Sequence, residues 1–125
     1  MRIRSLLHAT TLVLLASCNP ITQTCTLIGC EDGLAVRLSG VPAGAYRVEA
    51  WSELRIAPQV FECGAGETCP PVFFPGFQGN DVTVRVTTAA GVRTQSFADV
   101  EYEPLYPNGR RCGGACRQAT VTVPL

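Results

Sequence analysis

The sequence predicts an all-β protein: an immunoglobulin-like antiparallel β-sandwich of about seven strands, stapled by disulfide bonds. Apolar and polar residues alternate with a period of two along most of the chain, which is typical of strands that bury one face. Glycine and proline turn signals separate these segments about every 8–12 residues, the spacing found in sandwiches. Six cysteines follow residue 24, an even number that suits a small disulfide-stabilised domain.

The alternating segments define both the expected strands and the expected core. Strands are predicted at residues 34–39, 46–51, 54–63, 72–74, 82–87, 92–102 and 119–123, and Pro58 is expected to break the third. Successive side chains point to opposite faces of a strand. We therefore expect an inward-facing set of Leu34, Val36, Leu38, Tyr46, Val48, Val82, Val84, Val86, Val121 and Val123. The outward-facing set is Arg37, Arg47, Glu49, Thr83 and Arg85.

The first 18 residues have the pattern of an export signal. Arg2 and Arg4 precede an apolar stretch that is too short to span a bilayer, which needs about 20 residues. The stretch ends in Leu15-Ala16-Ser17-Cys18, which resembles the lipobox of bacterial lipoproteins at all four positions. The resemblance implies cleavage before Cys18 and attachment of lipid, with acyl chains such as palmitate, to that cysteine. The alternative is an ordinary secretory signal in which the cysteine has no such role.

This pattern divides the chain into a signal peptide at residues 1–17, a lipidated tether at 18–30 and a β-sandwich domain at 31–125. Two or three acyl chains on one residue hold a protein on a membrane far more firmly than a single chain does. The expected localisation is therefore the cell envelope, with the protein lipid-anchored. Asn19 stands where an aspartate would suggest retention in the inner membrane, so the outer membrane is favoured.

Composition excludes several functions for the 108 residues that remain when the first 17 of the 125 are removed. They carry eight arginines against ten acidic residues, so a nucleic-acid partner, which requires a basic surface, is not expected. The only histidine is His8, within the signal, and the chain has no lysine. Catalytic triads, histidine-ligated zinc and Schiff-base chemistry therefore lack their residues. We expect no enzyme activity, no catalytic residues and no cofactor.

Two pairs of acidic residues remain as candidates for chemistry. Glu101 and Glu103 stand two apart on one predicted strand face, where they could serve a glycosidase or lie on a solvated surface. Glu31 and Asp32 could ligate calcium, or they could be polar residues at a strand entry. For both pairs we favour the alternative without chemistry, which is a solvated strand face for the first pair and a polar strand entry for the second.

The cysteines after the lipobox predict three disulfides in an oxidising compartment. They are Cys25, Cys30, Cys63, Cys69, Cys112 and Cys116. The middle two are close enough in sequence to form a local bridge. Cys112 and Cys116 could also form a local bridge. Alternatively, Cys25 and Cys30 could pair with Cys112 and Cys116 and so join the first strand to the last. Spacings of four and three residues also resemble those of zinc sites, but the compartment and the lack of histidine argue against a bound metal.

Residues 38–48 read as two strands joined by a turn. Such hairpins are typical of carboxypeptidase-regulatory-like and transthyretin-like domains, which this segment resembles in the run Leu38-Ser39-Gly40-Val41-Pro42-Ala43-Gly44-Ala45-Tyr46-Arg47-Val48. The resemblance covers about a tenth of the chain and implies a β-sandwich of a mostly non-catalytic kind. The chain is also similar to uncharacterised small bacterial lipoproteins that end in a Cys-x₃-Cys and a strand rich in valine and threonine. That second resemblance implies no function.

Residues 69–79 form the candidate binding loop. Three prolines stiffen this loop, and it carries Phe73, Phe74 and Phe77. Because neighbouring strand residues face opposite sides, the first two cannot both enter one core unless the chain bends. Either the aromatics fill the core beneath a loop, or at least one is exposed as an apolar lip for an envelope protein, peptide or glycan. Trp51 is a second candidate for exposure.

Two classes of function follow from these observations. The first is a lipid-anchored, non-catalytic interaction or structural module of the cell envelope, with the membrane as a partner through the lipid on Cys18. The alternative is a small envelope enzyme, or an enzyme inhibitor, that acts through a disulfide-pinned loop. The missing catalytic residues favour the first class.

Overall fold

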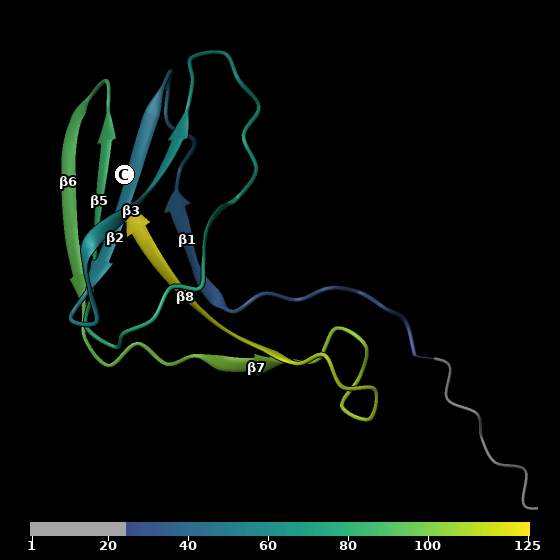
Figure 1. Cartoon of the computed structure of the whole chain (residues 1–125). Coiled ribbons are helices and arrows are strands. Elements are labelled where there is room, and N and C mark those ends of the chain that lie inside the picture. Colours follow the sequence, from purple (N-terminus) through teal and green to yellow (C-terminus); the bar gives the residue numbers. More distant parts are fainter. Residues whose placement is uncertain (1–24) are drawn as a thin grey trace, which may run out of the picture.

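The computed structural model describes residues 25–125, so the expected lipidation site at Cys18 lies outside the described residues. Within these residues, eight strands form two four-stranded sheets (Figure 1). The first sheet contains, in spatial order, β4 (Val72–Pro75), β1 (Gly33–Ser39), β8 (Cys116–Pro124) and β7 (Glu103–Leu105). The second contains β3 (Arg55–Cys63), β2 (Tyr46–Ser52), β5 (Val82–Thr88) and β6 (Gly91–Phe97). The predicted all-β sandwich is confirmed, with eight strands in place of about seven.

One strand pairing departs from the antiparallel pattern. β1 and β8 lie side by side in parallel, from Gly33 beside Gln118 to Ser39 beside Pro124, and their arrows point the same way in Figure 1. Both strands therefore begin at the same end of the sandwich, which we call the tether end because the described chain also starts there. Between residues 25 and 125 the chain forms no helix that is long and apolar enough to cross a membrane.

The core lies between the two sheets, and valine dominates it. All the valines of the expected inward-facing set are buried, together with Leu34, so the predicted register is confirmed. Leu38 and Tyr46 lie partly exposed and pack against this core from its rim. Each fully buried side chain of this size contributes about 1.5–3 kcal/mol relative to an exposed one.

Glu49 is the exception in the outward-facing set. It lies on the outer face of the second sheet, as the alternation predicts, yet only 7% of it is exposed. Arg85 donates a hydrogen bond to its carboxylate at 2.7 Å, Arg47 contacts the other oxygen at 3.4 Å, and Arg85 also lies over the ring of Trp51. The hydrogen bond from Arg85 holds the pKa of Glu49 below its ordinary value, although desolvation acts in the opposite direction. The predicted outward direction of Glu49 is therefore confirmed, but its side chain is buried because Arg47 and Arg85 cover it.

Pro58 does not end the third strand, because β3 continues through it, but its pairing with β2 is irregular there: the register shifts between the pair Ala50–Gln59 and the pair Ser52–Arg55. The strand tolerates proline because β3 lies at the edge of its sheet and Pro58 falls at the irregularity in its pairing, the two places where a strand accommodates this residue.

All six cysteines after residue 24 form disulfides. Cys63 and Cys69 are joined locally, as expected. The other four adopt the long-range alternative, with bonds Cys25–Cys112 and Cys30–Cys116, so the local bridge between Cys112 and Cys116 does not form. Residues 25–30, which were assigned to the tether, are thereby joined covalently to the domain at both of their ends.

Candidate functional site

The predicted binding loop is largely part of the sandwich itself. Residues 72–75 form β4 and pair with β1, which places Phe74 opposite Leu34. Phe74 is 2% exposed and Phe77 is 1% exposed, and their ring centres lie 6.3 Å apart in the core. These two residues therefore follow the alternative in which the aromatics fill the core, and the alternative of an exposed apolar lip is wrong for them. The alternation within β4 sends Phe74 inward, and the bend that follows turns Phe77 inward as well.

Phe73 faces the opposite side of β4 and remains partly exposed. Its ring lies close over Gly33 of β1, where a Cβ atom would meet the ring at 2.6 Å and would also collide with the carbonyl oxygen of Phe74. Glycine is therefore required at position 33, and the ring covers the backbone that the glycine leaves bare. Phe73 is the only one of the three predicted aromatics that offers a surface.

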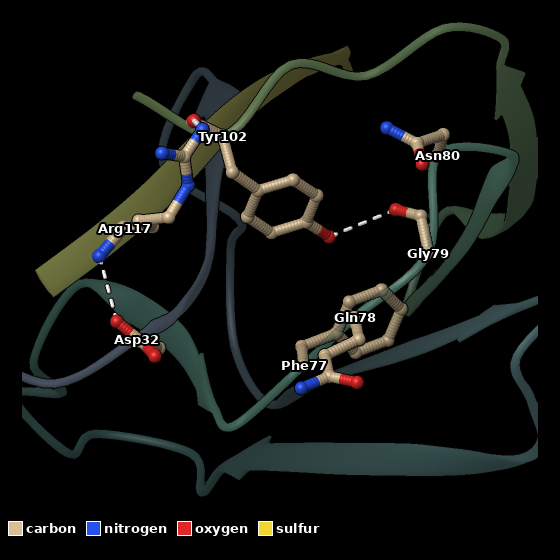
Figure 2. Close-up of a pocket in the computed structure, with 7 residues that line it drawn as sticks. All are labelled: Asp32, Phe77, Gln78, Gly79, Asn80, Tyr102 and Arg117. Carbon is tan, nitrogen blue, oxygen red and sulfur yellow. Dashed lines mark hydrogen bonds between the residues drawn. The ribbon is translucent and has the colours of Figure 1, made fainter. Parts of the chain in front are cut away.

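The second half of the predicted loop lines a hollow of about 290 Å³ at the tether end (Figure 2). Buried aromatic carbon and exposed polar groups meet there. The lining residues are Asp32, Phe77, Gln78, Gly79, Asn80, Tyr102 and Arg117. Segments from four distant parts of the sequence thus converge on one concave surface.

Hydrogen bonds fix the wall of the hollow at residues 78–81. The carbonyl of Gln78 accepts a bond from the buried Ser52 hydroxyl at 2.6 Å. The Glu53 carboxylate accepts bonds from the backbone N–H groups of Asn80 at 2.8 Å and of Asp81 at 3.0 Å. The bond from Asn80, followed by smaller backbone contributions, lowers the pKa of Glu53 below its ordinary value.

Gly79 is required in this wall for two reasons. Its φ of +113° is rarely adopted by residues with a side chain. A Cβ atom there would also meet the side chain of Ser52 and would lie 2.8 Å from a carboxylate oxygen of Glu53. The loop can therefore pack this tightly against the turn after β2 only with glycine at this position.

Tyr102 and Arg117 form the opposite wall. The phenol of Tyr102 donates a hydrogen bond to the carbonyl of Gly79 at 3.0 Å, which ties the two walls together (Figure 2). Burial, and secondarily the negative charge of Glu53, raise the pKa of Tyr102, so the phenol stays protonated at neutral pH. The guanidinium of Arg117 donates to the carbonyl of Tyr102 at 2.6 Å, and the backbone N–H of Arg117 donates to Asp32 at 2.6 Å.

The hollow retains groups that can bind a ligand. The guanidinium of Arg117 has donors beyond the one that holds Tyr102, and the carboxylate of Asp32 has a second oxygen. The exposed amide of Gln78 lies beside them. The hollow thus combines the positive charge of Arg117, the negative charge of Asp32 and the amide of Gln78 with aromatic side chains. Such a combination suits a polar ligand with several hydrogen-bonding groups, such as a peptide segment or a glycan.

Sequence reasoning missed four residues of this site, of which Asn80 lies one position beyond the predicted loop and the other three come from distant parts of the sequence. Asp32 was considered only for calcium, and Tyr102 and Arg117 were not singled out. Asp32 and Arg117 are 85 residues apart in sequence, and only the parallel pairing of β1 with β8 brings them together. No local spacing in the sequence carries that information.

The other acidic residues that the sequence analysis considered, Glu31, Glu101 and Glu103, do not line the hollow. Glu101 and Glu103 are exposed beside β8 on the outer side of the first sheet. Glu31 is exposed, and its backbone carbonyl accepts a hydrogen bond from Gln118. A third grouping places the carboxylate of Glu67 near the sulfurs of Cys63 and Cys69, but those sulfurs are bonded to each other and the carboxylate accepts the N–H of Gly64 at 2.9 Å.

Comparisons with protein-family models, with curated proteins and with solved structures find no match to this chain. Its function must therefore be inferred from its own residues.

Proposed function

We propose that this protein is a lipid-anchored, non-catalytic module of the cell envelope that presents the rigid hollow to an envelope partner. The observation that carries the proposal is the pair of disulfides Cys25–Cys112 and Cys30–Cys116. They join the segment that follows the lipobox to the same end of the sandwich that bears the hollow. A domain fastened in this way is held at a fixed end, close to the membrane.

The lipobox supports the anchor. Leu15-Ala16-Ser17-Cys18 has the residue types of the acylation signal, and the diacyl or triacyl group that it specifies gives firm attachment. Asn19 in place of aspartate favours the outer membrane over the inner one. The membrane is therefore one partner, and the hollow is available for a second, which we take to be a protein, peptide or glycan of the envelope.

The groups in the hollow support recognition rather than catalysis. Tyr102 is protonated and its hydrogen is donated to the backbone, so it is not a base. Asp32 and Arg117 are exposed and hydrogen-bonded to the backbone, which orients them without burying them. A site of this kind binds by shape and by hydrogen bonds, and its rigidity limits the entropy lost on binding.

The anchor is tested by Cys18→Ala. We expect the wild-type protein, extracted from membranes, to have Cys18 as its first residue and to carry acyl mass, and the variant to carry none, because the thiol is the acceptor. Intact-protein mass spectrometry measures both. Ser17→Ala, which keeps a small residue before the cut, is the matched control and should be acylated normally. A wild-type N-terminus at another residue, without lipid, would contradict the proposal.

The partner site is tested by placing a photo-crosslinking amino acid at Gln78, in cells that make the full chain. We expect a discrete cross-linked species at this position and none at Thr122, an exposed residue on the outer side of the first sheet. Arg117→Gln should reduce the cross-link about ten-fold or more, because a hydrogen bond to a charged group contributes about 1.5–3 kcal/mol. Equal cross-linking at both positions, or no effect of Arg117→Gln, would argue against the hollow as the binding site.

A further inference from the structure

The tether end carries a second surface, separate from the hollow, that fits a lipid bilayer. It consists of residues 26–29, which follow Cys25, and of the loop at residues 106–111, which precedes Cys112. The disulfide Cys25–Cys112 joins the two segments, with 5.6 Å between the Cα atoms. In Figure 1 both segments extend beyond the strands at the end where the described chain begins.

Exposed apolar side chains mark this surface. Leu27 is 99% exposed and Ile28 is 57% exposed, and Tyr106 lies on the neighbouring loop at 38%. Side chains of this kind are normally buried, and a cluster of them on a surface marks a contact with another body. Tyrosine in particular favours the interface between lipid and water.

The backbone that carries these side chains is held in place. The side-chain amide of Asn108 accepts the N–H of Ile28 at 2.9 Å and donates to its carbonyl at 3.0 Å. The same amide oxygen accepts a bond from the hydroxyl of Thr26 at 2.8 Å. Leu27, between these two residues, is therefore presented outward from a fixed backbone.

The charge of the surface is positive. Arg110 and Arg111 are both exposed, and the guanidinium of Arg110 lies 5.2 Å from the centre of the Tyr106 ring. Neither residues 25–30 nor residues 104–116 contain an acidic residue. The nearest acidic residues in sequence, Glu31 and Glu103, lie beside Gln118 of β8, on the strand side of this end.

The distance to the proposed anchor decides which partner this surface meets. From Cys18 to Cys25 the chain advances seven residues, which span at most about 25 Å when fully extended. With lipid on Cys18, the surface around Leu27 and Arg110 cannot leave the immediate neighbourhood of the headgroups. An anionic headgroup layer also complements its charge.

We propose that residues 26–29 and 106–111 dock directly on a bilayer that contains anionic lipid. Arg110 and Arg111 contact phosphate groups, Leu27 and Ile28 enter the apolar boundary, and Tyr106 lies between them at headgroup depth. The inference rests on the proposed lipid anchor for its geometry. It adds that the domain is oriented on the membrane, with the loops at residues 40–45 directed away from it.

The test uses the full protein, extracted from membranes and reconstituted into two kinds of vesicle. One kind contains phosphatidylglycerol and phosphatidylcholine, and the other contains phosphatidylcholine alone. Amide hydrogen exchange at residues 26–29 and 106–111 should be slower on the anionic vesicles than on the neutral ones. In about 0.5 M salt the exchange rate on the anionic vesicles should return to the rate on the neutral vesicles, because salt screens exposed charges. Exchange at residues 40–45 should be the same on both.

Arg110→Gln with Arg111→Gln should weaken docking about 30-fold, since each arginine near an anionic surface contributes about 1 kcal/mol. The matched control is Arg37→Gln with Arg93→Gln, which removes the same charge from exposed residues of β1 and β6 and should leave docking unchanged. Leu27→Ser should weaken docking by about ten-fold or more while its salt dependence persists, because burial of a leucine contributes about 1.5–3 kcal/mol.

Three results would overturn the docking proposal: equal exchange on both vesicles, equal effects of the two arginine pairs, or protection that follows protein density rather than lipid charge. The last would indicate contact between two copies of the chain. Failure of the anchor is distinguishable, because mass spectrometry would then find no acyl group. If the protein carries no acyl group, the docking proposal still requires it to co-sediment with preformed anionic vesicles. Its affinity for these vesicles must then fall about 30-fold in the variant Arg110→Gln/Arg111→Gln.

Discussion

Removal of both long-range disulfides should lower the free energy of unfolding by about 7 kcal/mol, whereas removal of either one should cost only about 3 kcal/mol. Each bridge alone closes a loop of 86 or 87 residues, which contributes about 4–5 kcal/mol through the entropy of the unfolded chain. Once one bridge is present, the other closes a ring of only about ten residues and adds about 3 kcal/mol. The two bridges are therefore partly redundant.

Chemical denaturation of Cys25→Ala/Cys112→Ala, of Cys30→Ala/Cys116→Ala and of the fourfold variant measures these costs. The local bridge provides a control: Cys63→Ala/Cys69→Ala opens a loop with a sequence separation of 6 and should cost about 2 kcal/mol. A single long-range pair whose removal costs as much as removal of both would contradict the redundancy. The single variants keep the prediction testable if the fourfold variant does not fold.

Phe77→Ala should lower the free energy of unfolding by about 3–5 kcal/mol, the usual cost of deleting a buried phenylalanine. Phe77 is 1% exposed and packs against Phe74, so its loss leaves a cavity where the two sheets meet the hollow. Urea denaturation at constant temperature measures the change.

Phe73→Ala is the matched control, because Phe73 is adjacent in sequence to the buried Phe74 but faces the opposite side of β4. Phe73 is only partly buried and lies on the outer side of the first sheet, so its loss should cost about 1 kcal/mol. If Phe73→Ala were as costly as Phe77→Ala, the assignment of faces in β4 would be wrong.

The alternating pattern predicted the core well because burial on one side of a strand is a local property. Val82, Val84 and Val86 are buried as expected, and the same rule separates Phe73 from Phe74. The rule fails where a neighbouring strand intervenes. Glu49 is covered by Arg85 of β5, and no inspection of β2 alone could have shown that.

Pairing between strands was harder to predict than the strands themselves. The long-range disulfides and the contact between Asp32 and Arg117 both depend on β1 lying beside β8, and the sequence of either strand is compatible with other neighbours. The hollow could not be predicted for the same reason. Its lining comes from segments that become neighbours only when both sheets have formed.

The parallel pairing of β1 with β8 also dictates an order of assembly. β8 lies between β1 and β7 inside the first sheet, so that sheet stays incomplete until the last strand is available. Contacts between such distant segments form slowly, because a long loop must close before they can form. If the chain is exported from its N-terminus as proposed above, Cys25 and Cys30 would reach the oxidising compartment before their partners Cys112 and Cys116, while the first sheet is still incomplete. Acylation at the N-terminus would then precede folding, and the sandwich would close only after the chain was already on the membrane.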